Sequence, residues 1–137
     1  MNAPIPAVTL RDTPDHLLQA LAKRFDKQFS QAMVIREQHG RDESAFTHVP
    51  PPAGVVFAET TQDVQDAIRL AASAHVPVIP FGVGSSLEGH LLAVQGGISV
   101  DVSRMNRVLE INAEDLTVTV QPGVTRMAVN AAVKDHG

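Results

Sequence analysis

The chain has 137 residues, a formal net charge of −4 and no cysteine, tryptophan or tyrosine. Its length suits one hydrophobic core, and 44% apolar with 19% charged residues is typical of a folded globular domain rather than a disordered segment. The composition excludes disulfides and thiolate chemistry, argues against a nucleic-acid partner, and offers no apolar stretch near the ~20 residues of a membrane span, so we expect a cytoplasmic location.

The N-terminal part predicts a poorly ordered lead followed by a helix. Residues 1–10 are rich in proline and alanine, which rarely order alone. We expect Thr13 to cap a helix, with Pro14 at its first position and Asp15 favourable to its dipole. Apolar residues then recur at helical spacing: Leu17, Leu18, Leu21, Ala22 and Phe25. This pattern predicts an amphipathic helix.

A polar stretch from residue 38 to residue 48 separates this helix from the core. It contains His39, Arg41, Asp42, Glu43, Ser44 and His48. The two histidines stand nine positions apart and do not share a helical face, so the spacing favours a solvated connecting loop over a metal site. We expect residues 1–49 to form the N-terminal helix and connecting loop, and residues 50–137 to form the main domain.

The next segment predicts a βαβ unit. The triple proline Pro50–Pro52 leads into an apolar run at residues 55–58, which is typical of a buried parallel strand. Thr60 or Thr61 then caps a helix with Asp63 in its first turn, and residues 78–81 form a second strand. The helix stripe consists of Val64, Ala67, Ile68, Ala71 and Ala72. Ligands of such units gather at the carboxyl ends of the strands.

The last third predicts three more strands and a helix. Ile98, Val100 and Val102 alternate with Ser99 and Asp101 as a third strand. Residues 108–111 and 116–121 flank turn residues and predict a hairpin. Thr125 should cap a final helix that packs through small and apolar residues: Met127, Ala128, Ala131 and Ala132. The fold class predicted overall is α/β (α+β).

The chain's central motif is the glycine loop at residues 80–90, directly after the second strand. No Lys or Arg occurs between Arg69 and Arg104, so neutral backbone dipoles would hold any phosphate bound here. The loop fits the Rossmann fingerprint poorly, because Leu87 stands where a third glycine is needed. It also fails as a Walker loop, because His90 and Leu91 replace the lysine and the hydroxyl residue. A tight turn between sheet elements remains a further alternative.

Several segments resemble one flavoprotein family. Residues 80–89 and 94–97 look like the pyrophosphate loop of the vanillyl-alcohol-oxidase type flavoproteins, and they are most similar to FAD-linked D-lactate dehydrogenases and glycolate oxidase flavin subunits. Further matching segments fall in the family's order: residues 39–44, Pro51, Val55, Met105, Arg107, Leu109, Glu110 and residues 121–125. The resemblance covers about residues 34–137 and implies the N-terminal half of a PCMH-type FAD-binding domain.

The resemblance also implies a cofactor site. The backbone of residues 82–87 would hold the FAD pyrophosphate, with hydroxyls of Ser85 and Ser86 as further donors and residues 122–124 beside the adenosine half. The implied site residues are Pro80, Phe81, Gly82, Val83, Gly84, Ser85, Ser86, Leu87, Gly89, His90, Pro122, Gly123 and Val124. Some relatives attach flavin through a histidine where this chain has Gly84 or Ser85, so we expect non-covalent FAD. We expect His90 to act as a hydrogen-bond donor and Glu88 to point away from the phosphates.

The family continues with a second glycine-rich segment and a substrate domain that this sequence does not contain. The implied parent is an FAD-dependent D-2-hydroxy acid dehydrogenase acting on D-lactate or glycolate, with a quinone or cytochrome as electron acceptor. It would be cytoplasmic, with peripheral membrane association left open. We expect the 137 residues alone to be inactive, to hold no catalytic residue or metal, to retain FAD weakly and to self-associate through uncovered apolar faces. The alternative is a non-redox nucleotide- or anion-binding module, or a subunit completed by another chain.

Overall fold

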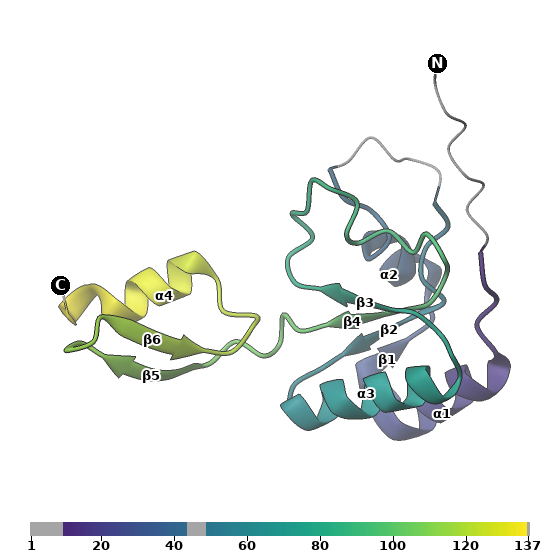
Figure 1. The fold of residues 1–137 in the computed structure, drawn as a ribbon, viewed down its shortest axis with the longest axis horizontal. Helices are drawn as coiled ribbons and strands as arrows, with labels where there is room; N and C mark the ends of the chain where they lie inside the picture. Colours follow the sequence, from purple (N-terminus) through teal and green to yellow (C-terminus); the bar gives the residue numbers. More distant parts are fainter. Residues whose placement is uncertain (1–9, 44–48, 137) are drawn as a thin grey trace, which may run out of the picture.

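The computed structural model describes residues 10–43 and 49–136 (Figure 1). The expected lead at residues 1–9, together with Ser44 and His48, lies outside these residues. The helices are α1 (Asp15–Phe25), α2 (Met33–Gln38), α3 (Thr61–Ser73) and α4 (Arg126–Val133), with short 3-10 helices η1 (Asp26–Gln28) and η2 (Lys134–His136). The strands are β1 (Phe29–Ser30), β2 (Gly54–Phe57), β3 (Val78–Phe81), β4 (Ile98–Asp101), β5 (Val108–Asn112) and β6 (Thr117–Val120). The predicted α/β class is confirmed.

Helix α1 begins one residue later than predicted. Pro14 rather than Thr13 is its N-cap, because the Pro14 carbonyl accepts the first N–H groups of the helix, from Leu17 and Leu18. A proline side chain offers no hydrogen-bond acceptor, so the helix has no side-chain cap. The buried row is also narrower than expected, since only positions spaced four apart are buried: Leu17, Leu21 and Phe25.

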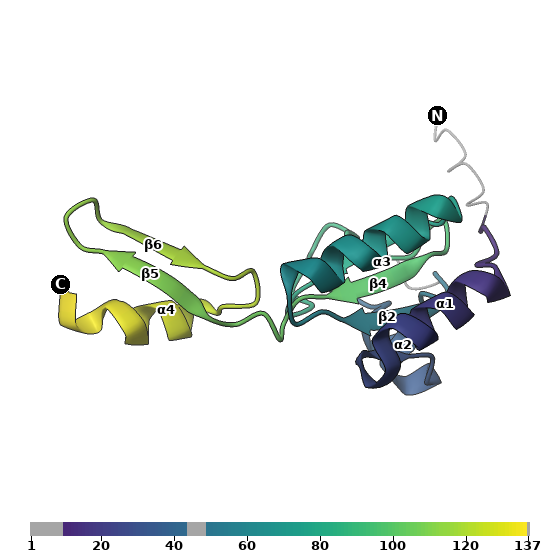
Figure 2. The ribbon, with the colours of Figure 1, turned by 90° about the horizontal axis from the view of Figure 1, so that it is seen from below.

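The main sheet has the strand order β1-β2-β4-β3. Strands β2, β4 and β3 run parallel, and the two-residue β1 pairs antiparallel with β2. Strand β4 therefore lies between the two strands of the predicted βαβ unit. Helices α1 and α3 lie side by side against one face of this sheet (Figures 1 and 2). Their apolar rows meet Val56, Ile98 and Val100 to form the core.

Strand β4 departs from the predicted alternation between buried and solvated residues. All four of its residues are buried, including Ser99 and Asp101. The reason is the position of β4 between β2 and β3. Helices α1 and α3 cover the face of Ile98 and Val100, and His39 contacts Asp101. Central parallel strands are buried on both sides for this reason.

Helix α3 begins as predicted, and Thr60 is the residue that caps it. The Thr60 hydroxyl accepts the N–H of Asp63, and the Asp63 carboxylate accepts the N–H of Thr60, which completes a capping box. Of the predicted stripe, Ala67 and Ala71 are fully buried. Ile68 and Ala72 are exposed instead, so the buried stripe of α3 is narrower than predicted.

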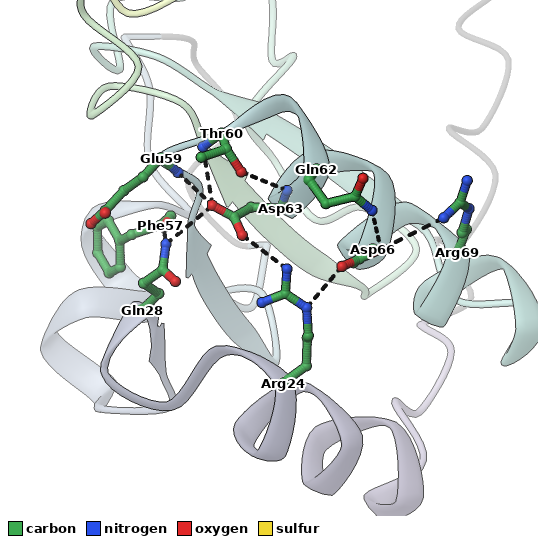
Figure 3. A network of polar contacts seen from close by, with 9 residues as sticks. All are labelled: Arg24, Gln28, Phe57, Glu59, Thr60, Gln62, Asp63, Asp66 and Arg69. Carbon is green, nitrogen blue, oxygen red and sulfur yellow. Dashed lines mark hydrogen bonds and ion pairs between the residues drawn. The ribbon is translucent and has the colours of Figure 1, made fainter.

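A polar network joins this helix start to α1 (Figure 3). The Arg24 guanidinium contacts Asp63 at 3.1 Å and Asp66 at 2.8 Å, and Gln28 donates to Asp63. Burial alone would raise the pKa of Asp63. Hydrogen bonds from the Glu59 backbone, Thr60, Gln28 and Arg24 outweigh it and hold that pKa below its usual value.

The C-terminal residues form a second lobe beside the main sheet (Figures 1 and 2). Strands β5 and β6 pair antiparallel, which confirms the predicted hairpin, and the Thr125 hydroxyl caps α4 by accepting the Ala128 N–H. The predicted packing face of α4 is wrong, because Met127 is 78% exposed. Val129 and Val133 instead face the hairpin and line a groove of about 290 Å³.

Candidate functional site

Three parallel strands end along one edge of the main sheet. The register places Phe57, Asp101 and Phe81 side by side in one row at these carboxyl ends. The backbone closes the row, since Ala58 donates to Asp101 and Val102 donates to Phe81. The glycine loop leaves this edge at Gly82. The structure therefore places the loop where ligands of parallel sheets bind.

The backbone of the glycine loop is rich in available donors. No N–H group of residues 82–88 donates a hydrogen bond to another residue that the structure describes. Gly84 has a φ of 73°, a conformation that only glycine adopts readily. A Cβ atom built on Gly82 would meet nothing within 4 Å, so the space beside this residue is open. Such a run of neutral donors beside open space fits a phosphate or diphosphate group.

The side chains of the loop are mostly exposed. Val83 and Leu87 expose 70% and 67% of their surface, an unusual share for two apolar residues so close together. The Ser86 hydroxyl lies 3.1 Å from Nδ1 of His90. The expected role of His90 as a hydrogen-bond donor to the cofactor stays a prediction. Ser85 and Glu88 are exposed, and Gly89, with a φ of 78°, makes the turn that ends the loop.

The row formed by Phe57, Asp101 and Phe81, called the edge row below, also contains half of a polar pair that the sequence did not predict, His39 and Asp101. His39, predicted to lie in a solvated loop, is 5% exposed and places Nε2 at 2.9 Å from Oδ2 of Asp101. Its Nδ1 lies 2.8 Å from the carbonyl oxygen of Ile35. The prediction was wrong because the partner stands far along the chain in β4. The aspartate that follows Ile98, Ser99 and Val100 in β4 was the available signal in the sequence.

Asp101 is held as a carboxylate. Burial alone would raise its pKa, but hydrogen bonds with His39 and Ser103 outweigh this effect and hold the pKa below its usual value. The imidazole of His39 also packs against two rings of the row, with centroid distances of 4.1 Å to Phe81 and 5.5 Å to Phe57.

The second predicted site segment, Pro122–Val124, lies against the linker that follows β4. The Gly123 N–H donates to the Met105 carbonyl at 2.8 Å. A Cβ atom on Gly123 would lie 2.4 Å from the Val102 oxygen and 2.7 Å from that of Ser103, so only glycine fits. Because Val102 also bonds to Phe81, this linker contacts the start of the glycine loop and the 122–124 turn alike.

Residues 10–43 and 49–136 contain neither a cluster of metal ligands nor a membrane-spanning helix. In that part of the chain, no three histidine, aspartate or glutamate side chains gather as metal ligands would. None of its helices has the length and apolar character needed to cross a membrane.

The open glycine loop at the carboxyl ends of parallel strands fits a nucleotide-type cofactor. The family profile described as "FAD binding domain" matches residues 52–137, which is more than half of the chain. The chain therefore belongs to this family of FAD-binding domains, and its cofactor is FAD. The neutral donors of residues 82–88 and the open space at Gly82 fit the diphosphate of that cofactor.

Individual relatives agree with the family. A probable mitochondrial D-lactate dehydrogenase of Danio rerio is 40% identical over 112 residues, covering 82% of this chain and 22% of that protein. A glycolate oxidase subunit of Bacillus subtilis is 34% identical over 86 residues, covering 63% of this chain and 18% of that protein. The solved structure of p-cresol methylhydroxylase superposes with a TM-score of 0.78 at 17% identity, covering 94% of this chain and 27% of that one; it supports the fold alone. The chain thus spans about a fifth of the length of these curated relatives.

Proposed function

We propose that this chain is the FAD-binding portion of a flavoprotein oxidoreductase that oxidises a D-2-hydroxy acid such as D-lactate or glycolate. The observation that carries the proposal is the run of N–H groups at residues 82–88, at the carboxyl ends of parallel strands, none of which donates to another residue within 10–43 and 49–136. The substrate class is taken from the names of the relatives, which act on lactate and glycolate, two acids that share a hydroxyl beside the carboxylate.

The chain's own residues would bind the cofactor rather than react. The N–H groups of residues 82–87 and the hydroxyls of Ser85 and Ser86 hold the diphosphate, and residues 122–124 lie beside the adenosine half. Bound FAD supplies the two-electron acceptor for the substrate. We assign no catalytic residue to these 137 residues. A quinone or a cytochrome is the proposed electron acceptor of the longer protein.

FAD is proposed to be held without a covalent bond. Residues 82–89 contain no histidine, cysteine or tyrosine that could attach to the flavin ring. His90 follows the loop, but its Nδ1 is engaged with the Ser86 hydroxyl. Denaturing the flavin-loaded protein should therefore release all of the flavin. Flavin that stays with the unfolded chain would contradict this part of the proposal.

The binding proposal is tested by titrating the isotope-labelled chain with FAD and following its amide signals by NMR, which detects weak binding as well as tight binding. FAD and ADP should shift the signals of residues 82–88, while riboflavin, which lacks phosphate, should not. The absence of any FAD-dependent shift in this loop would overturn the proposal. A loop that responds equally to inorganic pyrophosphate, ADP and FAD would favour the non-redox anion-binding module instead.

Gly82 offers a sharp variant for the same titration. Its side-chain space is open and its backbone needs no positive φ, so Gly82→Val should leave the free protein folded. The added side chain would occupy the space that we assign to the diphosphate, so FAD affinity should fall by about tenfold or more, a difference of about 1.4 kcal/mol. Gln65→Ala, on the exposed side of α3, is the matched control and should bind FAD as the unmodified chain does.

A further inference from the structure

We infer that His39 and Asp101 form a positioning pair that holds the glycine loop and the 122–124 turn in the arrangement that binds the cofactor. The inference rests on the proposed function, since it concerns the same site. Neither residue belongs to the glycine loop or to the turn. Both are more than nine-tenths buried and lie directly under the edge from which the loop departs.

The orientation of the His39 ring is fixed by hydrogen-bond partners on both sides. Both ring nitrogens of His39 have a partner: Nδ1 lies 2.8 Å from the Ile35 carbonyl oxygen and Nε2 lies 2.9 Å from Oδ2 of Asp101. The contact with the Asp101 carboxylate involves a charged group, and the two contacts together fix the plane of the ring.

The ring of His39 supports the glycine loop through Phe81. The two ring centroids are 4.1 Å apart, with an angle of 40° between the planes. The Phe81 ring in turn lies beneath Gly84, where an added Cβ would stand 3.1 Å from Cζ. Rotation of the imidazole would thus displace the surface on which the loop backbone rests. The position of the loop donors depends on this stack.

The segment that carries His39 touches the loop at a second point. The N–H of Glu43 donates to the Ser86 carbonyl at 3.2 Å. This bond uses a carbonyl oxygen of the loop and leaves its N–H groups available. His39 anchors the segment below the loop, and Glu43 anchors it at the side. Two contacts from one segment restrict the loop more than either contact alone.

Asp101 also helps to hold the 122–124 turn, the second segment of the proposed site. Its second oxygen, Oδ1, accepts the Ser103 N–H at 2.7 Å and so fixes the first turn of the linker after β4. The carbonyl oxygens of Val102 and Ser103 are the surface against which Gly123 packs. One carboxylate therefore orders both segments that contact the cofactor: the loop through His39 and the turn through Ser103.

The test compares four variants of the full chain at a temperature where circular dichroism shows each to be folded. His39→Phe keeps a ring but removes both ring nitrogens, and Asp101→Asn keeps the shape but removes the charge. His39→Gln retains a donor that can face Asp101. Asp63→Asn, whose printed side-chain partners include neither His39 nor Asp101, is the control for general destabilisation.

Two measurements separate positioning from folding. His39→Phe and Asp101→Asn should raise the FAD dissociation constant by about tenfold, as the loss of one charged hydrogen bond predicts. They should also increase the NMR-detected motion of residues 82–88 and 122–124 in the free protein. His39→Gln should recover part of the affinity, and Asp63→Asn should leave both readouts unchanged.

The inference fails if His39→Phe and Asp101→Asn bind FAD as the unmodified chain does, or if Asp63→Asn weakens binding equally. If the unmodified chain does not bind FAD, the proposed function fails. The motion of the two segments in the free variants still decides whether the pair positions them. Should His39→Phe not fold, Asp101→Asn and His39→Gln carry the same comparison.

Discussion

Asp63 is the most informative position for a stability measurement, because one carboxylate caps α3 and joins it to α1. Its side chain is 9% exposed and accepts from the backbone of Glu59 and Thr60, from Gln28 and from Arg24 (Figure 3). Asp63→Asn keeps an oxygen for the two backbone donors. It removes the negative charge and turns amide protons toward Arg24.

The expected loss of folding stability in Asp63→Asn depends on which hydrogen bonds the asparagine keeps. Hydrogen bonds to charged groups contribute about 1.5–3 kcal/mol each, and exposed ion pairs contribute less. The Arg24 side chain is 37% exposed, so water compensates part of its lost partner. The capping bonds remain because asparagine also caps helices well. We expect a loss of about 2 kcal/mol in the free energy of unfolding.

The loss is measured by urea unfolding followed by circular dichroism. With a slope of about 2 kcal/mol per molar urea, the midpoint should fall by about 1 M. The pKa of Asp63 is lowered in the folded protein, so its stabilising contribution is complete above the ordinary value of 3.8 and disappears as the pH falls through the lowered pKa. The difference between the two proteins should therefore shrink below pH 3.8. A difference that persists in acid, or a midpoint that does not change, would refute this assignment.

Three further predictions concern the sheet edge and the linker. Gly123→Ala places a Cβ within 2.9 Å of three carbonyl oxygens, so it should lower the thermal midpoint and shift the NMR signals of residues 102–105; an unchanged spectrum would contradict the packing described here. Ser99→Ala removes a buried hydroxyl that has no hydrogen-bond partner among residues 10–43 and 49–136, so the urea midpoint should stay the same or rise; a clear fall would contradict this. FAD binding should depend only weakly on salt, since in the proposed site backbone dipoles rather than lysine or arginine hold the diphosphate; a steep loss of affinity with added chloride would indicate a cation in the site.

Features set by neighbouring residues could be predicted from the sequence. The Thr60 capping box, the β5–β6 hairpin and the Thr125 cap each depend on residues within a few positions of one another. The position of the glycine loop was also predictable, because Phe81 ends an apolar strand and Gly82 begins a stretch rich in glycine and serine. Local chemistry determines all of these elements.

Features set by distant residues could not be predicted in this way. His39 and Asp101 stand 62 positions apart, and no periodicity relates them. Only the insertion of β4 between β2 and β3 brings Asp101 to the centre of the edge, and the sequence does not specify that strand order. The face of α4 was missed for a similar reason, since Val129 and Val133 pack on a hairpin whose orientation depends on the linker.

The electrostatics of the edge explain how a negatively charged cofactor can bind near acidic residues. Arg104, next to the edge row, contacts Glu59 at 2.9 Å and lies over the Phe57 ring, so its charge is already compensated. The Asp101 carboxylate likewise has its partners in His39 and Ser103. Arg104 and the His39–Asp101 pair therefore fix the row of rings and strand ends. Backbone N–H groups would therefore attract the diphosphate. Because they are neutral dipoles, their effect depends on the direction in which they point. A site of this kind depends on the exact position of its loop, which is why a buried pair beneath the loop can control binding without touching the ligand.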